Sequence, residues 1–164
     1  MTFRHLAVAA TVSVATGSTA AAQAVLFEIN KTDVEEMASF EPSGLALEYQ
    51  TRPFGAWGNL SFGAGVRVSG DDGESLWAGA GLYAEAPLGE NWVAEATLMP
   101  GFYDPGSLDF DLGGDFEIHS SLGMGYRVSE TSRVSLAITH LSNAGTADRN
   151  PGRNALALRL RHSF

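Results

Sequence analysis

The sequence has 164 residues, a net charge of −9 at pH 7 and no cysteine. Ten Lys and Arg residues stand against nineteen Asp and Glu residues, so a nucleic acid is a poor partner for the chain. Without cysteine, neither a disulfide framework nor a thiolate site can form. Beyond the N-terminal segment the length fits one domain, and no apolar run is long enough for a membrane-spanning helix.

The first 24 residues have the pattern of a cleaved secretory signal peptide. Arg4 is followed by an apolar run from Leu6 to Ala15, and small residues end the segment at Ala22-Gln23-Ala24. We therefore expect residues 1–24 to be removed. The mature domain would then comprise residues 25–164.

Alternating side chains predict eight β-strands in this domain. They are expected at Val25 to Lys31, Leu45 to Thr51, Leu60 to Val68, Leu76 to Ala86, Trp92 to Phe102, Phe116 to Val128, a seventh strand from Val134 through Ser142, and a last strand that contains Leu156 to Leu160. The first strand has the weakest pattern. Val34 to Phe40 could form a helical turn, and Pro53 and Gly55 break the chain after the second strand.

Most of these strands have one aliphatic or aromatic face and one face that carries charge together with Gly, Ser and Thr. The charged positions are Glu48, Arg67, Glu95, Glu117, Arg127, Arg133, Arg159 and Arg161. A soluble sandwich would bury the apolar face, whereas a membrane barrel would turn it to lipid and fill a narrow lumen with paired charges. Nineteen glycines, the even strand number and export without cysteine favour an eight-stranded antiparallel transmembrane β-barrel. The terminal Phe164 also resembles the C-terminal signature of bacterial outer-membrane barrels.

The barrel prediction fixes an expected topology. With both termini in the periplasm, the short turns are periplasmic and the longer loops are outside. The turns lie at Pro53, residues 87–91 and residues 129–132, and the loops at residues 30–43, 69–75, 104–114 and 143–153. His140 and Ser142 are then expected at the external end of their strand, facing the lipopolysaccharide leaflet.

His140 and Ser142 stand two positions apart, on the face that also carries the aliphatic residues of their strand. An imidazole beside a hydroxyl can take its proton, which activates a serine toward an ester. His119 and Ser121 have the same spacing, but they share a face with Glu117, so we expect them in a hydrogen-bond network in the lumen. The alternative for His140 and Ser142 is a pair of polar residues in the interfacial belt.

The segment His140-Leu141-Ser142-Asn143-Ala144-Gly145, with Asp148 to Gly152 and the last strand after it, resembles the C-terminal motif of the PagL-type lipid A 3-O-deacylases. These proteins are eight-stranded outer-membrane barrels that are often labelled acyloxyacyl hydrolases. In that family the histidine is the general base and the serine is the nucleophile, so the resemblance assigns these roles to His140 and Ser142. It also suggests that the oxyanion donors follow the serine, here Asn143 and the backbone of Gly145.

One position departs from the family pattern. The family's triad acid is a glutamate twelve residues after the serine, where this chain has Asn154. Asn154 shares a face with Leu156, so we expect it on the lipid side beside His140. An asparagine can accept the imidazole N–H and hold the tautomer, but it cannot offset the charge of the imidazolium. Activity would then be weak, or another acid such as Asp148 would take the position.

We therefore expect an outer-membrane serine esterase that removes the 3-O-linked acyl chain of lipid A, with no cofactor and no metal. The four histidines are scattered, and no pair has the ligand spacing of a zinc site. The expected partner is lipid A in the lipopolysaccharide of the outer leaflet. The competing hypothesis is a non-catalytic barrel, structural or lipid-binding, that has lost the triad acid. The sequence leaves open which acyl chain is removed and whether the chain forms a homodimer.

Overall fold

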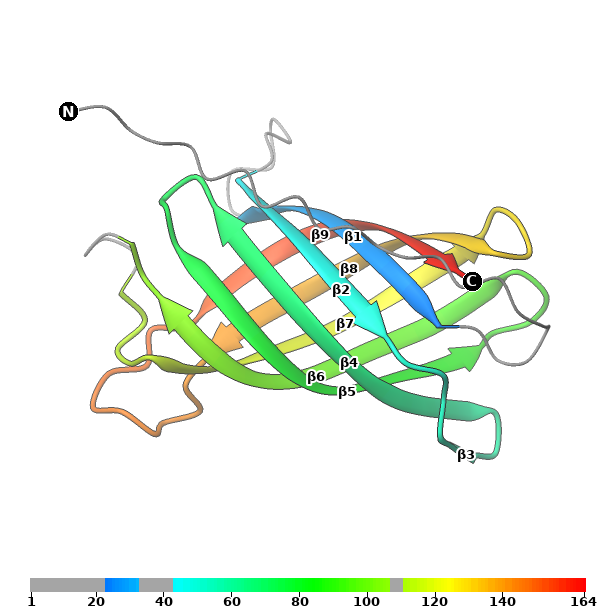
Figure 1. Cartoon of the computed structure of the whole chain (residues 1–164), viewed down its shortest axis with the longest axis horizontal. Coiled ribbons are helices and arrows are strands. Elements are labelled where there is room, and N and C mark those ends of the chain that lie inside the picture. Colours follow the sequence, from blue (N-terminus) through cyan, green and yellow to red (C-terminus); the bar gives the residue numbers. More distant parts are fainter. Residues whose placement is uncertain (1–22, 33–42, 107–110) are drawn as a thin grey trace.

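The structure of the chain is a computed structural model that describes residues 23–32, 43–106 and 111–164. In these residues one antiparallel sheet curls into a barrel of tilted strands (Figure 1). Its strands are β1 (Ala24–Thr32), β2 (Gly44–Gln50), β3 (Gly55–Trp57), β4 (Leu60–Asp71), β5 (Leu76–Pro87), β6 (Trp92–Asp104), β7 (Phe116–Arg127), β8 (Ser132–Ser142) and β9 (Arg153–Ser163). The described part of the chain contains no helix that is long and apolar enough to cross a membrane.

The sheet closes through its first and last strands. β1 pairs with both β2 and β9, and β2 pairs with β4, so that eight long strands form a ring of antiparallel neighbours. Closure leaves no unpaired strand edge along the barrel wall. The prediction of an eight-stranded antiparallel barrel is therefore confirmed.

The short strand β3 was not expected, because Pro53 and Gly55 predict only a break after the second strand. Gly55 instead pairs with Phe62 at the start of β4, and the Phe62 ring occupies the space that a Cβ on Gly55 would need. Gly58 turns the chain back with a φ of +60°. The result is a small hairpin that extends one end of the barrel.

The other strands lie where the alternation predicts them, and most extend by a few residues at their ends. The possible helical turn at Val34 to Phe40 lies outside the described residues. Residues 1–22 of the expected signal peptide also lie outside them. β1 already begins at Ala24, one residue before the expected mature chain. The cleavage site stays a prediction.

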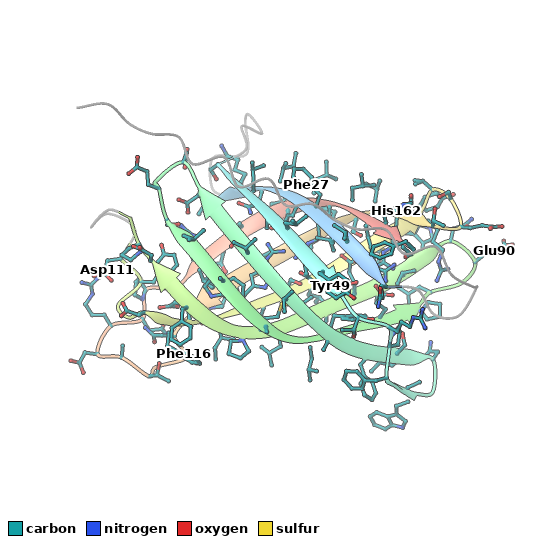
Figure 2. The ribbon with its side chains drawn as sticks, in the orientation of Figure 1. Phe27, Tyr49, Glu90, Asp111, Phe116 and His162 are labelled. Atoms are coloured by element: carbon teal, nitrogen blue, oxygen red, sulfur yellow. The ribbon has the colours of Figure 1, made fainter. Side chains whose placement is uncertain are left out.

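The two ends of the barrel differ. We call the end with residues 71–75, 105–106, 111–115 and 143–152 the loop end, and the end with the short connections and the C-terminus the turn end (Figure 1). In Figure 2, Asp111 and Phe116 mark the loop end, and Glu90 and His162 mark the turn end.

The outer wall between these ends is apolar. Large side chains such as Phe27, Phe102 and Leu122 point away from the barrel, and Phe102 and Leu122 expose 73% and 70% of their surface (Figure 2 shows Phe27). Such a continuous apolar surface would be unfavourable in water, whereas it matches the hydrocarbon region of a bilayer.

The lumen is filled by charged side chains in ion pairs. Glu28 accepts from Arg67 Nη2 at 2.6 Å and from Arg159 Nε at 2.7 Å, and Arg133 bridges Glu85 and Glu95. Pairing of this kind offsets much of the desolvation cost of burying these charges. The pairs connect strands that are not neighbours in the barrel wall, such as β1 with β4 and β6 with β9.

Most of the charged residues expected on the inner face are buried there. Arg161 is half-buried, and Arg127, which ends β7 at the turn end, is exposed and donates to the carbonyl oxygen of Glu90 at 2.9 Å. The alternation along β7 directs the Arg127 side chain inward, but at Arg127 the strand has already passed the rim of the barrel. Conversely, the expected charged set lacked Glu28 and Glu85, which the structure places in the lumen network.

Candidate active site

Three strands carry the candidate residues side by side on the outer wall at the loop end. In the register of the sheet, His140 of β8 lies opposite Asn154 of β9 on one side and opposite Ser120 of β7 on the other. All three side chains point outward, and His140 and Asn154 are exposed. The period-two alternation of the strands therefore collects these polar groups on a surface that is otherwise apolar.

His140 and Asn154 form a hydrogen bond, with 2.8 Å between Nδ1 and Oδ1. Because an amide oxygen can only accept, Nδ1 carries the proton and Nε2 keeps its lone pair. The expectation that Asn154 lies beside His140 on the outer face agrees with this contact. Such an arrangement prepares the imidazole to accept a proton at Nε2.

Ser142 ends β8, opposite Ile118, and its side chain is half-buried. Two residues along a strand correspond to a rise of ~7 Å, so its hydroxyl stands beside the imidazole on the same face. Within the described residues no hydrogen bond joins Ser142 to His140. Contacts of this kind are often long in a free enzyme and shorten when substrate binds.

Asn143 organises the loop that follows Ser142. Its side chain is fully buried, and Nδ2 donates to the carbonyl oxygens of Leu112 and Arg149 at 3.1 and 2.7 Å. Its Oδ1 accepts from the backbone N–H of Gly145 at 2.9 Å. One amide thus joins the β8–β9 loop to the β6–β7 loop and fixes the start of the segment after Ser142.

The backbone of this segment is strained. Ala144 and Gly145 have φ values of +53° and +77°, and the N–H of Thr146 donates to the carbonyl of Asn143 at 3.1 Å. Two positive φ values at the centre of a turn are the pattern of a type I′ turn, which costs little at glycine but ~1 kcal/mol or more at alanine. Strain of this kind is often found at functional sites.

The expected oxyanion donors are engaged in this loop. The N–H of Gly145 and the amide of Asn143 make the bonds described above, and the backbone N–H of Asn143 donates to Oδ1 of Asn150 at 3.2 Å. That bond holds the Asn150 carboxamide next to the peptide that joins Ser142 to Asn143. Its Nδ2 has no partner among the described residues. Asn143 and Gly145 stay predictions, and Asn150 is a donor that the sequence analysis did not single out.

Gly152 packs against the imidazole of His140. A Cβ at this position would lie 3.1 Å from Cε1 and 3.6 Å from Nε2, and Gly152 has a φ of +65°. The backbone can approach the ring this closely because glycine has no side chain. The histidine is therefore held between Asn154 on β9 and the end of the β8–β9 loop.

The start of β9 is anchored from inside the barrel. Arg153, the neighbour of Asn154, pairs with Asp71 at 2.5 Å, and its guanidinium lies 5.7 Å from the centre of the Tyr103 ring. Asp71 also accepts from the N–H groups of Gly73 and Ser75, so it orders the β4–β5 loop. These contacts fix the backbone that presents Asn154 to His140.

Asp148, which was considered as a substitute acid, is exposed in the β8–β9 loop. Across the described ranges no hydrogen bond or ion pair connects it to His140. In this structure Asn154 occupies the position at Nδ1. Among the same residues no cluster of three or more His, Asp and Glu side chains has a geometry for a metal ion.

The second histidine and serine pair, His119 and Ser121, lies in the lumen. His119 and Ser121 are both buried, and the Ser121 hydroxyl bonds Thr97 at 2.7 Å and Arg159 at 3.1 Å. His119 differs from expectation, because neither ring nitrogen has a hydrogen-bond partner in the described part of the chain. Its ring packs against Trp77 with 5.6 Å between centroids. The inward direction of both side chains separates this pair from the outer wall.

A third serine and histidine pair was not anticipated. Ser132 and His162 point outward at the turn end, where the hydroxyl lies 3.1 Å from Nδ1. The signal in the sequence was that Ser132 lies two positions before Val134 and so shares its face, although residues 129–132 were predicted as a turn. Since this pair lies at the opposite rim, it offers a natural control for experiments on Ser142.

Comparison with known proteins bears directly on this arrangement. The family model described as lipid A 3-O-deacylase (PagL) matches residues 43–163, which include every candidate residue named above. The chain belongs to this family. A curated relative, lipid A deacylase PagL of Bordetella bronchiseptica, is 30% identical over 88 residues, or 54% of this chain. The match spans 44% of that relative's length, less than half of it.

Solved structures agree with the PagL-family fold. The crystal structure of the outer membrane enzyme PagL aligns with a TM-score of 0.58 at 16% identity, over 86% of this chain and 99% of that chain. A designed transmembrane β-barrel aligns with a TM-score of 0.55 at 8% identity, over 91% of this chain and all of its own. Identities this low show the fold alone. Together with the family match, they make this PagL-family chain an integral barrel of the bacterial outer membrane.

Proposed function

We propose that this chain is a serine esterase that removes the 3-O-linked acyl chain of lipid A in the outer leaflet of the outer membrane. The observation that carries the proposal is the hydrogen-bonded pair of His140 and Asn154, next to Ser142, on the apolar outer wall of a PagL-family barrel. A polar group on such a surface is accessible to a substrate within the lipid layer. Lipid A has ester-linked chains at that depth.

The proposed reaction needs only these side chains and water. Ser142 Oγ attacks the ester carbonyl carbon while His140 Nε2 takes the hydroxyl proton. When the bond from carbonyl carbon to sugar oxygen breaks, the imidazolium returns that proton to the sugar oxygen. Water, deprotonated by His140, then attacks the acyl-serine, and the fatty acid leaves as Ser142 regains its proton. No cofactor takes part.

Asn154 would hold the productive tautomer of His140 during both steps. It cannot offset the positive charge on the imidazolium, as a glutamate would. The corresponding loss in a serine protease triad is ~10⁴-fold in rate, or about 5 kcal/mol of barrier. We therefore propose a slow enzyme. The rate that is left without the triad acid comes from the serine, the base and the oxyanion donors.

The oxyanion would be bound by the segment after Ser142. The N–H of Gly145 can serve if it leaves Asn143 Oδ1, whereas Nδ2 of Asn150 needs no bond to be broken. Replacing Asn150 by Asp keeps the acceptor for the Asn143 N–H and removes the donor. We expect Asn150→Asp and Asn150→Ala to lower the rate to a similar extent, by ~10²-fold or more, if the donor is the functional group.

Mass spectrometry of lipid A is the direct test. Expression of the wild-type chain in a cell with an unmodified outer membrane should yield a lipid A species lighter by one 3-hydroxyacyl group, or by that group with its secondary chain. Ser142→Ala and His140→Ala should abolish the species while the barrel stays folded. Ser121→Ala and Ser132→Ala serve as controls and should leave it unchanged, because one serine faces the lumen and the other lies at the turn end. Unchanged lipid A with well-folded wild-type protein would refute the proposal.

A second candidate is a barrel that binds lipid A without hydrolysing it. The replacement of the family's acid by Asn154 and the absence of a bond between Ser142 and His140 in the described structure favour this reading. Such a protein would retain lipid A in a pull-down from detergent extract without changing its mass. The two candidates therefore give opposite results in the mass measurement.

A further inference from the structure

The described part of the outer wall carries one polar cluster that extends over three neighbouring strands, β7, β8 and β9. It consists of the three candidate residues and one further side chain: His140, Ser142, Asn154 and Ser120. Among the described strands, the other charged, hydroxyl, amide or imidazole side chains that point outward lie at or next to strand ends, at Lys31, Tyr49, Asp104, Tyr126, Ser132 and His162. Ser120 is therefore the member of this cluster that the proposed reaction does not use.

The surroundings of Ser120 are apolar on its remaining sides. It lies opposite Leu98 on β6, and Ile118 and Leu122 precede and follow it on the same face of β7. Among the described residues, its hydroxyl reaches the carbonyl oxygen of His140 alone, at 3.5 Å, the limit of a hydrogen bond. A hydroxyl facing lipid is most stable when a polar group of a ligand completes its hydrogen bonding.

Ser120 also lies in a groove that starts at the candidate site. The groove has a volume of about 380 Å³ and lies on the outer wall between β7 and β8. Of its lining residues, Ser120, Leu122, Ile138 and His140 point outward, whereas the buried side chains of Ser121 and Thr139 point into the barrel. It runs from His140 toward the turn end, the direction in which an acyl chain bound at Ser142 would enter the hydrocarbon layer.

The separation of Ser142 and Ser120 matches the reach of an oxygen on the third carbon of an acyl chain whose ester is bound at Ser142. Ser120 lies ~7 Å along the strand direction and one strand spacing of ~4.8 Å from Ser142, so the two residues are ~8.5 Å apart. A carbonyl carbon poised for attack lies ~3 Å from the serine oxygen. The oxygen on the third carbon is three bonds further, and a hydrogen bond of ~2.8 Å spans the remaining distance.

We propose that Ser120 is a specificity-determining residue, which donates a hydrogen bond to the oxygen on the third carbon of the acyl chain that Ser142 releases. This inference rests on the proposed esterase function. It adds that the site selects 3-oxygenated chains over plain saturated chains of the same length. The selection acts on the leaving acyl group, while the sugar is bound elsewhere.

The test uses the purified barrel in detergent micelles with two synthetic glucosamine 3-O-esters, one carrying a 3-hydroxytetradecanoyl chain and the other a tetradecanoyl chain. For the wild type we expect kcat/KM to favour the hydroxylated ester by about tenfold, the usual effect of one neutral hydrogen bond. Ser120→Ala should reduce this ratio to about one by slowing only the hydroxylated ester. Ser120→Thr, which keeps the hydroxyl, should restore the preference, and Ser132→Ala should leave it unchanged.

The outcomes separate the two proposals. If wild-type protein hydrolyses both esters without preference, or if Ser120→Ala slows both esters equally, the specificity role of Ser120 is overturned while the esterase function stands. If folded wild-type protein hydrolyses neither ester and leaves lipid A intact, the esterase function fails and the role of Ser120 fails with it.

Discussion

Asn154 accepts a hydrogen bond from His140 across the β8–β9 pair, at 2.8 Å between Oδ1 and Nδ1, in the place where a triad acid would stand. The backbone around this bond is fixed on both sides. Arg153 is anchored inside the barrel by Asp71, and Gly152 packs on the imidazole ring. The position of Asn154 relative to His140 is therefore fixed, but its amide carries no negative charge.

Restoring that charge should accelerate hydrolysis. We expect Asn154→Glu to raise the rate of lipid A deacylation by up to ~10³-fold, because a carboxylate stabilises the imidazolium that forms when Ser142 is deprotonated. Asn154→Ala should lower the rate below that of the wild type, since nothing then holds the tautomer. Both rates can be measured on purified barrels in micelles. A rate for Asn154→Glu at or below the wild-type value would show that another residue fills the role.

Gly152 gives a second test of the site, because its substitution moves His140 without changing any functional group. Gly152→Ala places a methyl group 3.1 Å from Cε1 of the ring, so the imidazole must shift, and we expect a rate loss of at least ~10-fold. The matched control is Gly58→Ala, at the turn end, where φ is also positive and a Cβ meets open space. Both variants should lose a similar ~1–2 kcal/mol of stability. Equal activity of the two would contradict the placement of the ring.

The lumen network should dominate the stability of the barrel. Arg159 is buried and joins Glu28, Glu95 and Ser121, so Arg159→Ala leaves carboxylates without their partner. We expect a loss of ~3–5 kcal/mol in the free energy of unfolding. Arg149→Ala removes an arginine whose side chain is 65% exposed, and it should cost less than ~1 kcal/mol. Urea titration of both variants in the same detergent measures the difference, and similar losses would count against a stabilising network.

The orientation in the membrane can be tested with a single introduced thiol, because the chain has no cysteine of its own. On intact cells, a membrane-impermeant maleimide should label Ala147→Cys in the β8–β9 loop and fail to label Glu130→Cys in the β7–β8 turn. Permeabilised cells provide the control, in which both positions should react. Labelling of Glu130→Cys alone on intact cells would invert the proposed topology.

The alternation of side chains was enough to predict the strands, the closure into eight and the outward direction of His140 and Asn154, because these features depend only on a period of two along each strand. What depends on distant segments could not be predicted. Asn143 is bound to Leu112 and Arg149, and neither contact leaves a signal near Ser142 in the sequence. Glu28 lies in the strand with the weakest pattern, and its partners Arg67 and Arg159 are remote in the chain.

The candidate residues lie on the outside of a filled barrel, and this has a consequence for kinetics under the proposed function. The substrate would approach by lateral diffusion within its own leaflet and would never pass through water. The relevant concentration is then the mole fraction of lipid A among the surrounding amphiphiles. Adding inert detergent to a micellar assay should therefore slow the reaction by surface dilution, even when the bulk concentrations of enzyme and lipid A are held constant.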